Sequence, residues 1–300
     1  MASSGVEQKP SKTALFAALH RALANKECKN DRLGPDYLAE NFLPPHIRFL
    51  IRSKTIRAKV KNKLRAHLPG MHEYIIARTA FFDRVFMDAL NEKIPQIVLL
   101  GAGYDTRAYR YEKMNTATKI IELDISSTQD RKKNCLKKAQ IEIPKKVTLV
   151  PVDFNKESLK TVLEKTGYEN QKQTLFLWEG VSYYLEPESV DATLELVNYS
   201  SHSESLIVFD YSISVPKDKI SNYYGLKELA QAMKKHNPDE KIKFVMDEGK
   251  IESFLEQRGL KIVKHMDNEQ IEDTFLLDEN GSSIGKITGN FCFVLASPKG

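Results

Sequence analysis

The sequence contains little cysteine, one tryptophan and no long apolar run. Its 300 residues include 3 Cys and 1 Trp, and Cys28, Cys135 and Cys292 lie far apart without metal-ligand spacing. We therefore expect no disulfide framework, no metal site and a reducing, cytoplasmic environment. No stretch approaches the roughly 18 to 20 apolar residues that a membrane span requires. The first residues also lack the apolar core of a secretory signal, so we expect neither export nor a membrane partner.

Acidic residues are absent between Asn41 and His72. The middle of that segment, residues 48–65, is a basic arm that carries Arg48, Arg52, Lys54, Arg57, Lys59, Lys61, Lys63 and Arg65. Apolar residues recur every four positions within and just after the arm, which predicts a helix with its cations on the opposite face. Two interpretations stay open: a solvated helix packed on the body of the protein, or a surface for an anionic substrate or nucleic acid.

The remaining composition, 41% hydrophobic and 28% charged, is that of a folded protein with a sizeable core. Helical spacing at 12–24 and 73–90 predicts a helical cap over residues 12–94, after a flexible terminus at 1–11. Short β-branched runs then alternate with helix-prone stretches, which is typical of an α/β domain, here 95–300. The candidate strands are 96–100, 118–124, 146–154, 173–180, 205–211, 259–266 and 289–297. Residues 212–249 fit this alternation poorly and are predicted to be an insertion after the fifth strand.

A glycine turn follows the first candidate strand. Gly101 and Gly103 lack side chains, so the backbone can turn sharply there and a nucleoside ligand can approach it. The next strand ends at Asp124, 21 residues beyond Gly103, where a carboxylate can accept both ribose hydroxyls, and Glu122 is the alternative. The third fingerprint position is Thr106 instead of glycine, which disfavours a dinucleotide. A cofactor with a ribose and no phosphate, such as S-adenosylmethionine, fits this pattern.

Five motifs carry a family resemblance: IARTAFFDR, LLGAGYDTRAYR, ELD, VDF and WEGVSYYL. Together they resemble the leucine carboxyl methyltransferase family, and in particular its bacterial branch of S-adenosylmethionine-dependent O-methyltransferases. The resemblance covers about residues 12–211. It implies a Rossmann-like class I methyltransferase fold, with seven mostly parallel strands, an antiparallel last strand and a helical N-terminal cap. It also implies S-adenosyl-L-methionine as cofactor and S-adenosyl-L-homocysteine as product.

The same resemblance assigns roles to individual residues of this chain. Arg78 would hold the methionine carboxylate, Gly101 and Gly103 would lie beneath the cofactor, and Asp124 would bind the ribose. The adenine would lie at Asp153 and Phe154, and Glu179 would lie near the amino group and reaction centre. Tyr183 and Tyr184 would line the cleft, with no catalytic residue assigned beyond them. Asp105, Thr106 and Arg107 match the family as well, but we interpret them as residues that fix the turn.

The predicted activity is methyl transfer to an oxygen of a small molecule or peptide terminus. We expect a carboxylate, because it is ionised at neutral pH and needs no general base. The alternative is a nucleic-acid-binding protein or base methyltransferase that uses the basic arm. We do not expect that partner, since WEGVSYY differs from the N/D-P-P-Y/F tip that resembles amino-directed base methylation. A third hypothesis, a nicotinamide-dependent oxidoreductase, is disfavoured by Thr106. The sequence carries no signal for an oligomeric state.

Overall fold

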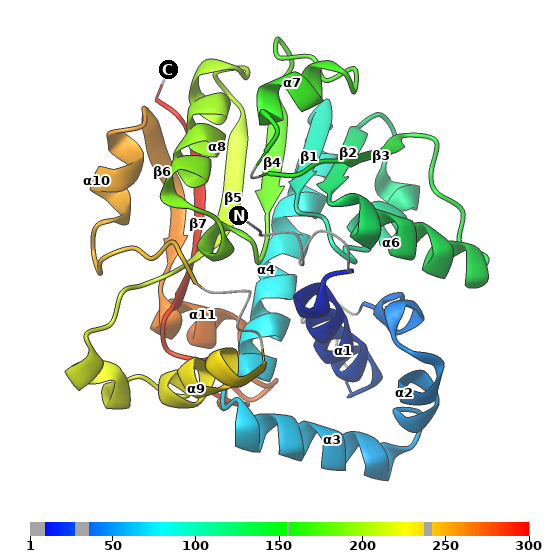
Figure 1. Ribbon diagram of the computed structural model, residues 1–300, viewed down its shortest axis with the longest axis vertical. Coiled ribbons are helices and arrows are strands. Elements are labelled where there is room, and N and C mark those ends of the chain that lie inside the picture. Colours follow the sequence, from blue (N-terminus) through cyan, green and yellow to red (C-terminus); the bar gives the residue numbers. More distant parts are fainter. Residues whose placement is uncertain (1–9, 28–35, 155, 237–241, 300) are drawn as a thin grey trace.

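One sheet organises the molecule and carries helices on both faces (Figure 1). The computed structural model describes residues 10–27, 36–154, 156–236 and 242–299. The strands are β1 (Gln96–Leu100), β2 (Lys119–Asp124), β3 (Val147–Pro151), β4 (Thr174–Trp178), β5 (Leu206–Ser212), β6 (Leu260–Met266) and β7 (Phe291–Pro298). They form a 7-stranded sheet in the order β3-β2-β1-β4-β5-β7-β6. This confirms the predicted α/β fold class.

The strand directions create a crevice at the middle of the sheet. Strands β1 to β5 run parallel, and β7 is antiparallel to both β5 and β6. The chain order reverses where β1 lies beside both β2 and β4, with Ile97 opposite Ile120 on one side and Leu175 on the other. Ligands of open α/β sheets bind at the carboxyl ends of the strands at such a switch point. Figure 1 shows these carboxyl ends facing the cap helices.

The two faces of the sheet bury two separate apolar clusters. Because side chains alternate along a strand, Ile97 and Leu99 of β1 belong to one cluster and Val98 and Leu100 to the other. The second cluster also buries Trp178, as expected for a core tryptophan. Burial on both faces explains why the central strands are continuous apolar runs.

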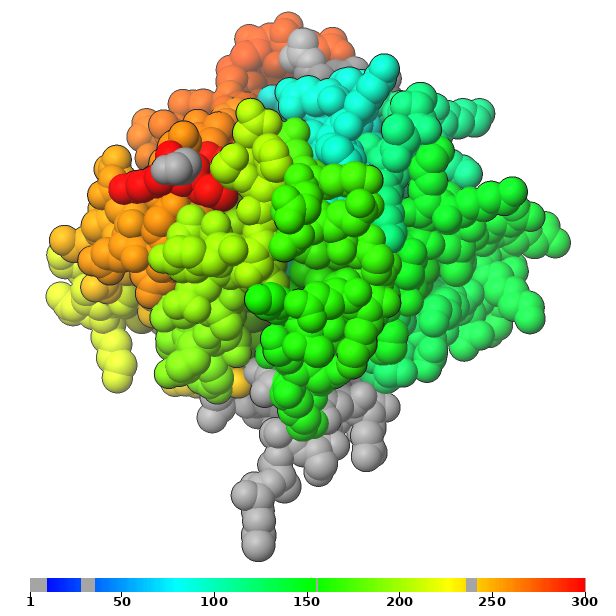
Figure 2. Space-filling view, turned by 90° about the horizontal axis from the view of Figure 1, so that it is seen from above, coloured from blue at the N-terminus to red at the C-terminus, as the bar shows by residue number. Residues whose placement is uncertain are grey.

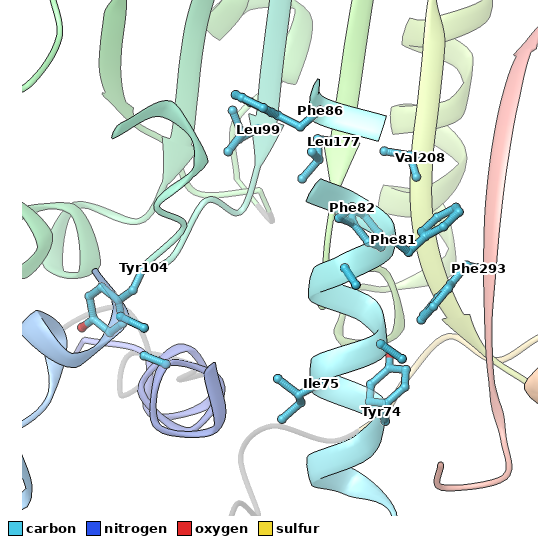
Figure 3. Close-up of a cluster of buried hydrophobic side chains, with 14 of the residues drawn as sticks. Tyr74, Ile75, Phe81, Phe82, Phe86, Leu99, Tyr104, Leu177, Val208 and Phe293 are labelled. Atoms are coloured by element: carbon cyan, nitrogen blue, oxygen red, sulfur yellow. The ribbon is translucent and has the colours of Figure 1, made fainter. Parts of the chain in front are cut away.

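Helix α4 (Met71–Asn91) covers the first cluster and extends past the strand ends into the cap. Figure 3 shows Phe81, Phe82 and Phe86 pointing from this helix toward the sheet. Phe81 stacks on Phe293 of β7 with ring centroids 5.0 Å apart. Such aromatic burial fixes the axial position of α4, and therefore of every side chain on it.

The cap consists of α1 (Lys12–Glu27), η2 (Ala39–Phe42), α2 (Pro45–Leu50) and α3 (Lys54–His67), followed by α4. Helix α1 is three residues longer than the spacing predicted, and α3 carries most of the basic arm. The region predicted as an insertion contains η5 (Lys217–Asn222) and α9 (Leu226–His236). The other helices are α5 (Arg107–Arg110), η3 (Glu112–Met114), α6 (Ser126–Lys138), α7 (Leu159–Glu164), η4 (Ser182–Tyr184), α8 (Pro187–Tyr199), α10 (Ile251–Glu256) and α11 (Asn268–Phe275).

The cysteines and the apolar stretches can now be compared with what the sequence led us to expect. Cys135 and Cys292 are free thiols, whereas Cys28 lies outside the described residues. Within the described ranges, no helix has both the length and the apolarity needed to cross a bilayer.

Candidate cofactor-binding and active site

The glycine turn after β1 needs both of its glycines. Gly101 and Gly103 have φ angles of 70° and 48°, in the left-handed region that glycine adopts readily. A Cβ atom on Gly101 would lie 2.6 Å from Cγ2 of Val181, and one on Gly103 would lie 3.2 Å from Cβ of Ala14 in α1. At this turn, backbone without side chains therefore lies between the loop after β4 and helix α1.

Asp124, at the end of β2, is held beside this turn. Its Oδ2 atom accepts a hydrogen bond from the Gly103 N–H at 2.5 Å, and its Oδ1 atom accepts one from the Ile125 N–H at 2.7 Å. Burial raises the pKa of Asp124 to about 6, although both backbone hydrogen bonds favour the ionised form. Because each carboxylate oxygen has two lone pairs, the group can still accept two hydroxyl donors, which fits a ribose.

Glu122, the alternative ribose acid, occupies a different environment. Its carboxylate is fully buried and pairs with Nζ of Lys132 in α6 at 2.5 Å. Of the two acids, Asp124 is the one that is hydrogen-bonded to the glycine turn. The ribose contact itself stays a prediction.

Arg78 of α4 meets the loop after β4 and the end of β5. Its Nε atom donates to Oε1 of Glu179 at 3.0 Å. Its Nη1 atom donates to the Tyr183 hydroxyl and to Oδ2 of Asp210, both at 3.2 Å. The structure thus brings together three of the predicted site residues, Arg78, Glu179 and Tyr183, in one buried cluster.

Arg107 joins this cluster, which the sequence analysis missed. Its Nη1 atom pairs with Oε2 of Glu179 at 2.7 Å and also with Asp105, and its Nε atom pairs with Asp83 at 2.7 Å. Burial by itself would raise the pKa of Glu179, but Arg107 and Arg78 together lower it to about 2. The motif D-T-R carried no signal of this contact, because it contains only Asp105, while Asp83 and Glu179 lie far away in the sequence.

Asp210 is the second member that the sequence analysis missed. It is completely buried on β5, where Oδ1 accepts the Gly180 N–H at 2.6 Å and Oδ2 accepts the Tyr74 hydroxyl as well as Arg78. An acid inside the apolar run SLIVFDY could have indicated it, since a buried charge requires partners.

The glycine turn and Asp124 suit a nucleoside cofactor, and comparisons with known proteins agree with this. The family model of leucine carboxyl methyltransferase matches residues 14–198. The chain belongs to the leucine carboxyl methyltransferase family. This confirms the family predicted from the five motifs.

Relatives of this methyltransferase family member have names of one kind. A Bacillus subtilis (strain 168) protein named as a candidate S-adenosyl-L-methionine-dependent methyltransferase, YktD, is 34% identical over 67% of this chain and 65% of its own length. A Mycobacterium tuberculosis (strain ATCC 25177 / H37Ra) protein with the same kind of name is 30% identical over 47% of this chain and 45% of its own. The chain thus matches between about half and two thirds of the length of these relatives. Their names support S-adenosyl-L-methionine as the predicted cofactor.

Two solved structures share the fold. A candidate methyltransferase from Thermobifida fusca YX aligns over 98% of this chain and 96% of its own, with a TM-score of 0.58 and 13% identity. A DUF574 family protein from Streptomyces avermitilis aligns over 94% of this chain and 97% of its own, with a TM-score of 0.59 and 10% identity. At these identities the likeness supports the class I methyltransferase fold alone.

The two residues that the family resemblance assigns to adenine lie apart from the buried cluster. Asp153 follows β3, and its carboxylate pairs with Lys156 at 2.9 Å. Phe154 is partly buried and lines a 460 Å³ cavity between α7 and α8, which lie side by side in Figure 2. Their contact with adenine stays a prediction. Tyr183 is buried and its hydroxyl accepts from Arg78, and Tyr184 packs against it in a T-shaped arrangement.

A buried histidine pair joins α1 to α4. Nδ1 of His20 and Nδ1 of His72 are 2.9 Å apart, so one ring donates to the other. Burial lowers the pKa of both rings, that of His72 to about 3, with help from Lys61 and Arg65. The pair is therefore neutral at physiological pH and forms part of the core.

We expect this pair to make the protein sensitive to acid. Each histidine has a pKa near 6.5 in the unfolded chain, so below that pH the unfolded chain binds protons that the folded chain does not bind. Stability is then full above pH 6.5 and falls on acidification, by about 2 kcal/mol per histidine at pH 5. Urea unfolding at pH 7.5 and 5.0 measures the loss.

The double variant His20→Leu, His72→Leu removes both titrating rings and is expected to flatten this pH dependence. His46→Leu, at an exposed position of α2, serves as the matched control and should leave the pH dependence unchanged. If the double variant lost as much unfolding free energy as wild type between pH 7.5 and 5.0, other groups would be the cause.

Proposed function

We propose that the protein is a cytoplasmic S-adenosylmethionine-dependent O-methyltransferase that methylates a carboxylate of a small molecule or peptide terminus. The observation that carries the proposal is that one sheet holds both a carboxylate suited to a ribose, Asp124 of β2, and a buried cluster of acids and arginines around Glu179, which follows β4. Membership of the leucine carboxyl methyltransferase family supports it.

Asp124 and the glycine turn are the groups suited to the nucleoside. Asp124 keeps acceptor capacity beside the Gly103 N–H, and the absent side chains of Gly101 and Gly103 allow a ring to approach the backbone. When bound, the cofactor supplies a methyl group on a sulfonium, which an in-line displacement transfers. The protein's task is to align the two reactants and exclude water.

The charge of the buried cluster favours a cationic ligand. Its arginines are Arg78, Arg107 and Arg110, and its acids are Asp83, Asp105, Glu179 and Asp210. Three positive and four negative charges leave one net negative charge. A sulfonium compound with an amino group offers the complementary sign, and in a water-poor site this attraction is strong.

The same cluster supplies no general base, which suits an acceptor that is already ionised. Burial raises the pKa of Tyr183 and of Tyr74, so both hydroxyls stay protonated, whereas Glu179 is held ionised by two arginines with its pKa near 2. None of these three groups is a base suited to neutral pH. A carboxylate acceptor needs no such base, whereas a phenol or alcohol does.

The experiment begins with calorimetry of S-adenosylhomocysteine binding to wild type and Asp124→Ala. Loss of a buried charged hydrogen-bond partner is expected to weaken binding by about 1 to 3 kcal/mol, or roughly 5-fold to 150-fold. Asp130→Ala, on the exposed surface of α6, is the matched control and should bind as wild type does. Unchanged affinity in Asp124→Ala would remove this residue from the site.

A screen with tritiated methyl donor then compares carboxylic acids, phenols and peptides as acceptors. Base-labile counts on carboxylic acids or peptide termini are expected, since methyl esters hydrolyse in alkali. Transfer only to phenols would contradict the proposed acceptor class while leaving the methyl transfer intact.

A further inference from the structure

Helices α3 and α9 lie at the end of the molecule away from the sheet (Figure 1). They are joined where the Pro69 carbonyl contacts Gly225 so closely that a Cβ would not fit there. Helix α3 contains six Lys or Arg and no acid, and α9 contains three Lys and one acid, Glu228. The exposed cations of α3, of α9 and of the turn before α3, which together we call the basic end face, are Arg52 and Lys54, Lys59 and Lys63, Lys227, Lys234 and Lys235.

Four of the six cations of α3 form two sets, apart from Lys54 and from Arg57, which donates to the carbonyls of Ile51 and Arg52. Lys61 and Arg65 face the body and pair with Glu27 of α1 and Glu73 of α4. Lys59 and Lys63 are exposed, one turn apart, and have no ion pair within the part of the chain that the structure describes. The inward set accounts for the attachment of α3, so the outward set is left without a structural role.

Exposed apolar side chains accompany these cations. Phe49 and Leu50 of α2 are 70% and 40% exposed, and Tyr224, just before α9, is 51% exposed. Arg48 and Arg52 flank the first two in sequence. Aromatic and aliphatic side chains beside cations are the combination that enters the headgroup region of a bilayer while the cations meet anionic lipid.

We propose that the basic end face docks on an anionic lipid surface, with Phe49 and Leu50 entering the headgroup region. Lysines on α3 and α9 would meet the lipid phosphates, while the apolar side of α3 stays packed on the protein. The sequence analysis expected no membrane partner because no segment could span a bilayer, but surface binding requires no such segment. This proposal is independent of the proposed methyl transfer.

A nucleic acid is the competing partner for the same charges. Phosphate contacts would use the lysines equally well, and an aromatic ring can stack on an unpaired base. Neither contact uses the exposed aliphatic Leu50, which gains free energy by leaving water at a bilayer surface. The apolar pair therefore favours lipid.

Vesicle co-sedimentation tests the proposal with the full-length protein. We expect binding to vesicles of phosphatidylcholine with 30% phosphatidylglycerol at about 0.1 M salt, little binding to pure phosphatidylcholine, and release at about 0.5 M salt. Lys59→Gln with Lys63→Gln should weaken binding roughly twenty-five-fold, since each cation near the surface contributes about fivefold. Phe49→Ser with Leu50→Ser should weaken it roughly tenfold or more.

Matched variants on other faces show whether the loss of vesicle binding is specific to this surface or follows from any loss of charge or exposed apolar area. Lys133→Gln with Lys137→Gln on α6 removes two cations, and Tyr199→Ser on α8 removes a 77% exposed aromatic ring. Both are expected to bind vesicles as wild type does, and unfolding curves confirm that every variant folds. Equal losses in these controls, or no sedimentation of wild type with anionic vesicles, would overturn the proposal. Lysine-dependent retention of a single-stranded oligonucleotide without vesicle binding would assign the face to nucleic acid instead.

Discussion

Arg107→Met is expected to lower the free energy of unfolding by about 3 to 5 kcal/mol, the cost of leaving buried charge without its partner. Arg107 is 2% exposed and contacts three carboxylates, those of Asp83, Asp105 and Glu179. Arg110 still pairs with Asp83, but Asp105 loses its arginine and Glu179 keeps only Arg78. Methionine fills much of the same volume, so lost charge and not a cavity would cause the effect. Urea unfolding at pH 7.5 measures it.

Two further variants identify the cause. Arg107→Lys keeps the charge, yet a single ammonium cannot reproduce a guanidinium fork that reaches several acids, so we expect an intermediate loss. Arg258→Met removes an arginine from a partly exposed pair with Asp191 and should cost about 1 kcal/mol or less. If Arg107→Met and Arg258→Met lowered the free energy of unfolding equally, the buried network would contribute no more stability than a partly exposed ion pair.

Asp210→Asn is expected to lower both stability and cofactor affinity. The aspartate accepts from Tyr74, Arg78 and the Gly180 N–H, and an amide in its place presents a donor to at least one of these donors. We expect a loss of about 3 kcal/mol in unfolding free energy, as for other broken buried charge pairs. S-adenosylhomocysteine affinity should fall at least about tenfold, because Arg78 and the loop at Gly180 lose their common anchor.

The hydrogen bond from Tyr74 can be removed separately. Tyr74→Phe deletes one donor but keeps the Arg78 and Gly180 contacts, so we expect a loss of about 1 kcal/mol and near-normal affinity. Asp191→Asn, on the surface of α8, is the matched control for the chemical change. Wild-type affinity in Asp210→Asn would show that Arg78 is positioned without it.

The sequence predicted those parts of the fold that local chemistry determines. The central strands are apolar runs buried on both faces, and Gly101 and Gly103 have the backbone angles that only a turn free of Cβ atoms adopts readily. The end of β2 at Asp124 follows equally from local pattern. These features depend on short stretches of chain, so their spacing carries the information.

The partners of buried charges were not predictable in the same way. Arg78 contacts Glu179 and Asp210, which lie 101 and 132 positions further along the chain. Arg107 was read as a turn residue because its neighbour Asp105 offered a sufficient local partner, whereas Glu179 approaches it only when β1 and β4 pair. The pair of His20 and His72 likewise requires α1 to pack on α4. A single sequence does not specify which distant charges meet.

Helix α4 carries Arg78 one turn before Phe81 and Phe82, and its 21 residues form one rod of about 32 Å. The rod runs from the cap, past the strand ends, to Asn91 just before β1. A bound molecule that holds Arg78 in place would therefore suppress the opening of backbone hydrogen bonds along the whole of α4. Amide protons near Asn91 should then exchange with deuterium more slowly, so that binding at the carboxyl ends of the strands would be detected at their amino ends.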